Sequence, residues 1–200
     1  MPQFKTKLFG KRIVLKRLKP SILTASAVFK VVDENRKHLL PWFPWVTLNK
    51  QIEDSLKYLF DVDVKFKAGE KIDYGIYVNN EYIGNIGIFN INKKNKSAEI
   101  GYWLSTKFTR NGYMTEALGV LEKESFLNNN LNRIQIKCDE RNIPSAGVAK
   151  KAGYLLEGKY REDSYSEYFK DFRNTFIFSK LKSDFKKNKH DFNIKKFGSV

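Results

Sequence analysis

The chain has 200 residues, of which 42% are apolar and 14% aromatic, enough for one globular domain with a full core. Its formal net charge is +15 and it has one cysteine, which excludes an intramolecular disulfide framework and fits a reducing compartment. No run approaches the ~20 apolar residues of a membrane helix, and the first residues lack the apolar core of a signal peptide. We therefore expect a cytoplasmic protein with no membrane partner.

The first half of the chain predicts a strand, two helices and a hairpin. In the second helix Ile52, Leu56, Leu59 and Phe60 form one apolar face. The residues at 79–81 have the composition of a hairpin turn. The expected elements are, in order, a strand at 12–18, helices at 21–38 and 50–67, and strands at 73–78 and 82–89.

A loop rich in proline and tryptophan lies between the two helices. Pro41 and Pro44 remove backbone donors and stiffen it, while Trp42 and Trp45 offer large apolar rings. These rings either close the core or form the wall of a groove for a substrate. We expect a mixture, with one ring buried and one facing the groove.

The stretch after the next strand, at 99–104, is the most informative in the chain. A short basic turn with Arg110, Asn111 and Gly112 leads into a helix whose apolar face includes Met114. A strand–turn–helix of this kind directs free backbone N–H groups and the positive end of the helix dipole at one point. That point suits a pyrophosphate, and Arg110 can add a charge-assisted contact.

A second strand, at 133–138, delivers a second helix N-terminus. Asn142 is a good N-cap, Pro144 lies in the first turn, and Gly153 follows the end of the helix. Ser145 therefore lies at the mouth of this helix. Alternation places Cys138 on the apolar face of the strand, so we interpret it as a small core residue.

Two further strands, at 154–160 and 174–179, complete the sheet. Strands come first as a meander and later alternate with helices, which predicts an α/β (α+β) fold with a mixed, mostly antiparallel central sheet and helices on both faces. We expect a single domain over residues 1–182. The basic segment at 183–200 is predicted to be either a flexible arm for an anionic partner or a disordered end.

Several of these segments, in this order, resemble the GCN5-related N-acetyltransferases (GNAT), and within them the ribosomal-protein serine/alanine N-acetyltransferases. The likeness runs from about Phe9 to about Leu181. It is carried by Ile13–Leu18, by the tryptophan-containing segment Glu34–Val46, by Gly112–Ala117, by Asn142, Ser145, Val148, Lys151, Gly153 and Tyr154 with their spacing, and by Leu156-Glu157-Gly158.

The resemblance implies an acyl-CoA acyltransferase fold that uses acetyl-CoA as co-substrate, with no metal, and transfers the acetyl group to a primary amine by direct attack in a ternary complex. It implies that Ser145 protonates the departing thiolate. From its position at the start of the strand beside the phosphate turn, Glu99 is either the residue that orders a water to deprotonate the amine or an exposed strand-end carboxylate. Trp42 and Trp45 are the expected acceptor-binding residues. The expected cofactor-binding residues are Trp103, Leu104, Arg110, Asn111, Gly112, Tyr113, Met114, Thr115 and Asn142.

Two positions depart from the family pattern. Thr109 stands where the phosphate loop usually has glutamine or arginine, and Ser164 stands where related serine acetyltransferases have a glutamate proposed as general base. Glu162 and Asp163 are close in sequence, but neighbours on a strand or turn are expected to point elsewhere. The base therefore stays open, and neither His38 nor His190 is a strong candidate.

The acceptor is expected to be a protein or peptide N-terminal α-amine, as the resemblance suggests, of a ribosomal protein. A basic enzyme attracts an acidic stalk-type protein and repels a basic one. Two alternatives stay open: a small-molecule amine acetyltransferase, and a catalytically impaired basic ribosome- or RNA-binding protein on the same fold. Nucleic acid is otherwise expected to bind only to the non-specific basic surface, and a homodimer is left open.

Overall fold

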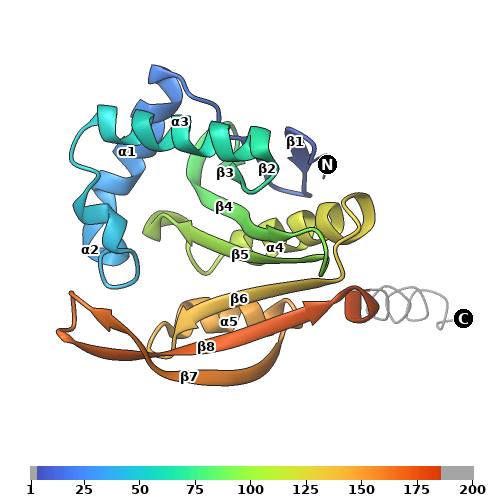
Figure 1. Cartoon of the computed structure of the whole chain (residues 1–200). Coiled ribbons are helices and arrows are strands. Elements are labelled where there is room, and N and C mark those ends of the chain that lie inside the picture. Colours follow the sequence, from blue (N-terminus) through green and yellow to red (C-terminus); the bar gives the residue numbers. More distant parts are fainter. Residues whose placement is uncertain (1–3, 186–200) are drawn as a thin grey trace, which may run out of the picture.

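The computed structural model describes residues 4–185. In that part of the chain eight strands form one sheet in the order β1-β2-β3-β4-β5-β6-β8-β7 (Figure 1). Every neighbouring pair is antiparallel except β5 and β6, which run parallel. The predicted mixed, mostly antiparallel sheet is confirmed. The strands are β1 (Lys7–Phe9), β2 (Val14–Arg17), β3 (Ile72–Val78), β4 (Glu81–Asn92), β5 (Ser97–Leu104), β6 (Arg133–Asp139), β7 (Leu155–Ser166) and β8 (Asp171–Leu181).

Helices cover both faces of this sheet (Figure 1). None of the described helices is long and apolar enough to cross a membrane. The helices are α1 (Ile22–Glu34), α2 (Arg36–Leu39), α3 (Ile52–Ala68), α4 (Tyr113–Lys123) and α5 (Ile143–Lys151), with 3-10 turns η1 (Pro44–Thr47) and η2 (Thr106–Phe108) and a π-helical turn η3 (Glu124–Asn128).

Two hydrophobic cores lie on opposite faces of the sheet. On one face Ile100 of β5 and Ile134 of β6 pack with Leu118 of α4. On the other face Trp103 of β5 packs in a cluster with Leu59 of α3. Successive residues of a strand point to opposite faces, so β5 contributes to both cores. Each of these buried side chains stabilises the fold by about 1.5–3 kcal/mol.

Helix ends follow the capping signals in the sequence. Helix α3 begins with a reciprocal capping box between Gln51 and Asp54, and it ends at Gly69, which has φ of 73°. Helix α5 is capped by Asn142, whose side chain accepts a hydrogen bond from the Ser145 amide at 3.1 Å. Gly153 follows α5 with φ of 80°, as predicted.

The predicted helix at 21–38 is wrong in one respect, because it is broken at Asn35. This residue has φ of −117° and ψ of 13° and is 3% exposed. Its side chain accepts a hydrogen bond from the Thr106 amide at 2.8 Å, which ties the first helical segment to the loop after β5. The apolar face predicted for α3 also needs correction, since Phe60 is 56% exposed; the buried face includes Val62 instead.

The last two strands are longer than predicted and form a hairpin that projects past the ends of its neighbours (Figure 1). Their register shifts between Tyr160 and Ser164, and Glu162 within this bulge has φ of 49°. A short strand, β1, was not predicted. Of the basic tail, residues 186–200 lie outside the described residues, so its predicted flexibility stays a prediction.

A candidate active site between diverging strands

The two parallel strands at the middle of the sheet separate along their length. Pairing of β5 with β6 covers only 97–99 and 133–135. Beyond this point the strands diverge, and a cavity of about 1070 Å³ is lined by 100–104 on one side and 136–139 on the other. The main chain of β5 along 100–104 is therefore free of its neighbouring strand at the cavity, as an edge strand is.

The N-terminus of α4 opens into this cavity. Its N-cap is Gly112, with φ of 77°, and no side chain caps the helix. The first helical hydrogen bond is donated by Glu116 to the Gly112 carbonyl at 3.0 Å. The amides of Tyr113, Met114 and Thr115 precede it and so have no acceptor within the helix, and all three residues line the cavity. Free main-chain amides at a helix N-terminus suit an anion.

An arginine that the sequence analysis missed supports the turn before α4. Arg12, next to β2, has its Nε 2.8 Å from Glu116 Oε2 and donates from Nη1 to the Asn111 carbonyl at 3.0 Å. Its guanidinium also lies over the Tyr113 ring, 4.8 Å from the centroid. Arg110, with φ of 64°, is exposed and lines the cavity. The side chain of Asn111 donates to the Thr109 carbonyl at 3.1 Å, and Asn111 does not line the cavity.

Burial of Glu116 favours its protonated form, but hydrogen bonds from Arg12 outweigh that effect and lower the pKa of this carboxyl. Glu116 is thus ionised at neutral pH and holds Arg12 against the turn. Thr109, the first departure from the family pattern, donates from its hydroxyl to the Thr106 carbonyl at 2.8 Å. Its side chain therefore closes the preceding 3-10 turn and leaves the helix N-terminus open.

The N-terminus of α5 supplies the second predicted group. Ser145 lines the cavity, and its Oγ lies 3.4 Å from the Tyr102 hydroxyl, which donates to the Ser145 carbonyl at 3.0 Å. Burial raises the pKa of Tyr102, so its hydroxyl keeps its proton and stays a donor. Asn142 also lines the cavity. The predicted pair of Ser145 and Asn142 therefore lies at the helix mouth that the sequence indicates.

Cys138 is 8% exposed and packs in the core on the same strand face as Ile134 and Ile136. Burial raises the pKa of its thiol. A protonated, buried thiol is a poor nucleophile; the interpretation of Cys138 as a small core residue is confirmed, and Cys138 also lines the cavity.

Glu99 lies at the point where β5 and β6 begin to separate. Its carboxylate is 3.0 Å from the Lys137 ammonium and accepts a hydrogen bond from Gln135 at 3.3 Å. The side chain is 13% exposed and lines the cavity. By strand alternation Glu99 points to the same face as Trp103, opposite to the face that carries α5. Glu99 and Ser145 thus approach the gap from its two sides.

The two tryptophans of the proline-rich loop lie in different places. Trp42 lines the main cavity and packs against Phe169 with ring centroids 5.9 Å apart. Trp45 is 38% exposed and lines a second cavity. Trp103 lines the same cavity, and the centroids of the two rings are 6.3 Å apart. The expectation of one buried ring is wrong, because the η1 turn places Trp45 at the surface and Trp42 is half-buried.

Among the lining residues that were missed or dismissed on sequence alone are His38, Asp163 and Arg173. Burial lowers the pKa of His38, so its imidazole is neutral near pH 7. Asp163 was expected to point elsewhere, and that expectation is wrong. The bulge in β7 breaks the side-chain alternation and lets Asp163 line the cavity. No sequence pattern marks such a bulge.

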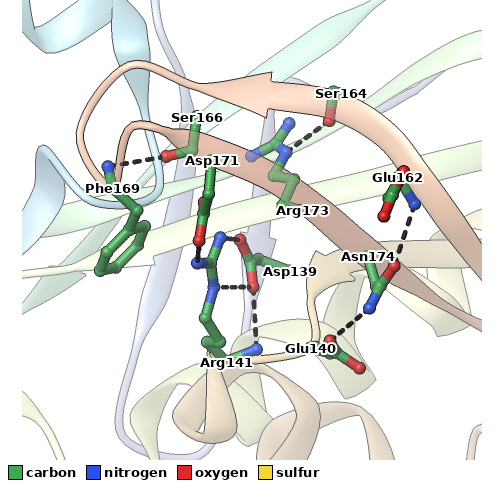
Figure 2. A network of polar contacts seen from close by, with 10 residues as sticks. All are labelled: Asp139, Glu140, Arg141, Glu162, Ser164, Ser166, Phe169, Asp171, Arg173 and Asn174. Atoms are coloured by element: carbon green, nitrogen blue, oxygen red, sulfur yellow. Dashed lines mark hydrogen bonds and ion pairs between the residues drawn. The ribbon is translucent and has the colours of Figure 1, made fainter.

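A polar network holds the end of β6 against the long hairpin (Figure 2). Arg141 binds Asp139 at 2.8 Å and Asp171 at 2.8 Å, and its guanidinium stacks on Phe169, 4.1 Å from the ring centroid. Asp139 is 5% exposed; burial opposes its ionisation, but hydrogen bonds from Arg141 outweigh burial and lower its pKa. The hairpin is therefore fixed over the cavity on the Glu99 side.

The same network stabilises the bulge. Asn174 donates to Glu140 at 2.6 Å and accepts from the Glu162 amide at 2.9 Å, as Figure 2 shows. Ser164, the second departure from the family pattern, accepts a hydrogen bond from Arg173 Nε. Ser164 is therefore hydrogen-bonded to Arg173, and its neighbour Asp163 is one of the carboxylates that line the cavity, with Glu99 and Asp139.

Comparisons with known proteins identify the family and the fold. Residues 12–155, more than half of the chain, match the family model of the acetyltransferase (GNAT) domain. The ribosomal-protein-serine acetyltransferase of Escherichia coli (strain K12) is 28% identical over 145 residues, which cover 70% of this chain and 81% of that protein.

Solved structures share the fold. RimL, a ribosomal L7/L12 alpha-N-protein acetyltransferase in complex with coenzyme A, superposes with a TM-score of 0.82 at 23% identity, over 88% of this chain and 97% of that one. MccE, a microcin C7 self-immunity acetyltransferase in complex with acetyl-CoA and AMP, superposes with a TM-score of 0.78 at 23% identity, over 86% and 93%.

The chain belongs to the acetyltransferase (GNAT) family. It is an acetyl-CoA-dependent acetyltransferase, and the residues present fit that donor. The uncapped N-terminus of α4, with Gly112 and Arg110, suits a pyrophosphate. The open edge of β5 along 100–104 can pair with the pantetheine amides as an added strand would.

Proposed function

We propose that this enzyme acetylates the N-terminal α-amine of a protein by direct attack within a ternary complex. The observation that carries the proposal is the gap between β5 and β6, which is lined from both faces of the sheet. Gly112 and Ser145 approach it from the side of α4 and α5, and Glu99 approaches from the other. Two substrates can therefore meet in the gap, and the buried Cys138 gives no support to a covalent enzyme intermediate.

Acetyl-CoA, when bound, supplies the thioester carbonyl that the amine attacks. The amides of 113–115 and Arg110 hold its pyrophosphate, and the main chain around Trp103 and Leu104 orients the pantetheine arm. Ser145 acts as general acid and donates its hydroxyl proton to the leaving sulfur, and solvent water then restores the proton of the serine. Tyr102 acts through Ser145, since its hydroxyl contacts both the carbonyl and the Oγ of that serine.

We assign the proton-accepting role to Glu99, acting through a water. It is a largely buried carboxylate on β5, at the point where β5 and β6 begin to separate, and Lys137 fixes its orientation. Asp163 is the second candidate, because it is the carboxylate of the β7 bulge that lines the cavity. Comparison of Glu99→Gln with Asp163→Asn separates the two, since only loss of the true base abolishes the acid limb of the pH–rate profile.

The proposed acceptor is a serine- or alanine-initiated protein N-terminus with an acidic sequence behind it. Two relatives carry names that specify ribosomal proteins as acceptors, and the net charge of +15 favours encounter with an acidic partner. Arg173 adds a cationic side chain to the acceptor side of the cavity, where Lys137 is already paired with Glu99. A ribosomal stalk-type protein has the required chemistry.

The test uses mass spectrometry to follow acetyl transfer from acetyl-CoA to peptides. One serine-initiated peptide has acidic residues after the N-terminus, a matched peptide has lysines at the same positions, and a third has its α-amine blocked. We expect transfer to the free acidic peptide, slower transfer to the basic one and none to the blocked one. Acetylation of small amines alone would replace the proposal by the small-molecule alternative, and salt-sensitive RNA binding without acetyl-CoA binding would replace it by the non-catalytic one.

A further inference from the structure

The end of the sheet that lies away from the gap is formed by the turn between β4 and β5, the segment that leads into β6, and the last residues of β8 (Figure 1). Main-chain hydrogen bonds join these three segments. The Lys96 carbonyl accepts from the amides of Asn132 and Arg133 at 2.7 and 3.1 Å, and the Lys182 amide donates to the Asn132 carbonyl at 2.9 Å. The side chains at this end therefore project from a fixed backbone.

Lysine side chains gather at this end of the sheet. None of them forms an ion pair with a carboxylate within residues 4–185. All are exposed except Lys182, which is half-buried and donates to Asn130 at 2.8 Å. They are Lys93, Lys94 and Lys96 in the β4–β5 turn, Lys123 at the end of α4, Lys182 after β8, and Lys5, whose amide donates to Glu124 of η3 at 3.1 Å.

The carboxylates carried by the same segments do not neutralise these lysines. Glu122 and Glu124 are each 2% exposed. Glu122 is paired with the buried Lys180, and Glu124 accepts from the Lys5 amide. Asp184, which is half-buried, accepts a hydrogen bond at 3.0 Å from the main chain at the end of β8. The surface at this end is consequently cationic.

The chain also leaves its described part at this end of the sheet. Residues 186–200, which lie outside the described residues, add five lysines and one aspartate to the sequence here. The acceptor side of the gap is different, because Lys137 and Arg141 are paired there with carboxylates. Cations without a carboxylate partner are thus concentrated away from that side.

The composition of this surface indicates the kind of anion that it binds. Lysine is depleted from the cores of protein–protein interfaces, where aromatic residues and arginine are enriched. Here exposed asparagines lie between the lysines, namely Asn92, Asn95, Asn130 and Asn132. Lysine and asparagine side chains both donate to phosphate oxygens. Repeated donors of this kind match a phosphate backbone, which presents a negative charge at every nucleotide.

We propose that this end of the sheet is a docking surface for the phosphate backbone of RNA. The β5 strand from Ser97 to Leu104 spans about 23 Å at a rise of about 3.3 Å per residue. A backbone bound at the lysine end therefore leaves the gap open to acetyl-CoA and to the acceptor. The role of the surface rests on the proposed acetylation of a ribosomal protein, which RNA would bring close to the enzyme, but RNA binding itself does not depend on that proposal.

The test titrates a fluorescently labelled RNA stem-loop with the full chain and follows anisotropy between about 0.05 and 0.2 M salt. The test variant combines Lys93→Gln, Lys94→Gln and Lys96→Gln. We expect its affinity to be at least about tenfold weaker, and the slope of log K against log salt to be smaller by about 2–3, because each lost phosphate contact lowers that slope by about 1.

The matched control combines Lys19→Gln, Lys30→Gln and Lys57→Gln, which removes the same charge from three exposed lysines elsewhere. Distant exposed charges are screened by salt, so this control should change RNA affinity by less than about twofold. Equal losses in the two triple variants would overturn the proposal, since binding would then follow net charge alone.

Three competing anions complete the test: polyglutamate, vesicles of anionic phospholipid, and a DNA duplex of the same sequence as the RNA stem. Tighter binding to any of them than to the RNA, or no RNA binding by the parent protein, would overturn the proposal. Acetyl transfer to the acidic peptide is measured on the same samples without RNA. Retained transfer with no RNA binding contradicts this inference alone, and RNA binding with no transfer contradicts the proposed acetylation alone.

Discussion

The two sides of the gap between β5 and β6 differ in the groups that form them. On the side of α4 and α5 the site consists mainly of main chain: uncapped amides after Gly112, an open strand edge and a helix mouth that holds Ser145. On the other side it consists of side chains from distant segments, among them Trp42 and Arg173. A donor that is the same for every acetylation can be held by backbone geometry, whereas an acceptor that differs between enzymes requires side chains that can change without disturbing the fold.

The largest expected effect concerns the framework of the donor side. Lys180 of β8 is 2.9 Å from Glu122 of α4 and donates to the Ala152 carbonyl at 2.6 Å; the paired side chains are 5% and 3% exposed. Lys180→Met leaves Glu122 buried without a partner and should lower the free energy of unfolding by about 3–5 kcal/mol, measured by urea denaturation.

Lys182→Met is the matched control, because Lys182 binds Asn130 at an exposed site and should change the free energy of unfolding by less than about 0.5 kcal/mol. The double variant with Glu122→Leu should recover much of the loss. Equal unfolding free energies for the two lysine variants would show that the donor side does not depend on this pair.

A substitution at the N-terminus of α4 should weaken binding of acetyl-CoA directly. Gly112→Asp places a negative carboxylate and a Cβ at a position with φ of 77°, so acetyl-CoA affinity should fall by about 100-fold while the fold is retained. Asparagine tolerates this backbone conformation and is neutral, which makes Gly112→Asn the control with a smaller loss. Calorimetry measures both affinities, and equal losses would refute the role of charge at the helix N-terminus.

Loss of the general acid should appear in turnover and leave donor binding intact. Ser145→Ala should lower kcat by about 100-fold, and Tyr102→Phe should lower it less, because Tyr102 acts only through Ser145. Steady-state kinetics with an N-terminal peptide gives kcat, and calorimetry gives the dissociation constant of acetyl-CoA. A fall in affinity with unchanged kcat would mean that Ser145 serves only the N-terminal turn of α5.

The smallest expected effect is on the pH dependence of stability, and it concerns Glu157, which lies away from both sides of the gap. Hydrogen bonds from Arg133, and then from Ser179, lower the pKa of Glu157 to about 2, below the unfolded value of about 4.3. A depressed folded pKa contributes stability above the unfolded pKa, and this stability is lost as pH falls from about 4.3 towards 2.

Because the Glu157 side chain is 43% exposed, the contribution should be only about 0.2–1 kcal/mol. Urea denaturation at pH 7 and pH 3 should therefore show a slightly smaller pH-dependent loss in Arg133→Gln than in the parent protein. Acetyl-CoA affinity at pH 7 should be the same in both. A change in that affinity would mean that this pair affects the donor site.

The donor side of the gap could be predicted better than the acceptor side, because its features are local in the sequence. The donor side follows from local patterns: Gly112 before a helix, Asn142 as an N-cap and Ser145 in the first turn are each readable within a few residues. Strand alternation and spacing also predicted the mixed sheet, although not the short β1, whose pairing with β2 depends on tertiary contacts.

The acceptor side could be predicted only in part. Asp163 faces the cavity because of a bulge that Asn174 and Glu140 stabilise from other strands, and the break at Asn35 depends on the Thr106 amide far along the chain. Trp45 lies at a different cavity from Trp42 because of a 3-10 turn. These features arise from long-range contacts that periodicity and spacing do not encode.

The most direct test of the central claim is a calorimetric titration of the protein with acetyl-CoA at moderate salt. If the uncapped N-terminus of α4 and the open edge of β5 form the donor site, binding is saturable, has a stoichiometry of one, is micromolar and is lost in Gly112→Asp. Absence of binding up to about millimolar acetyl-CoA, or binding that Gly112→Asp leaves unchanged, would contradict the assignment of this gap as the donor site.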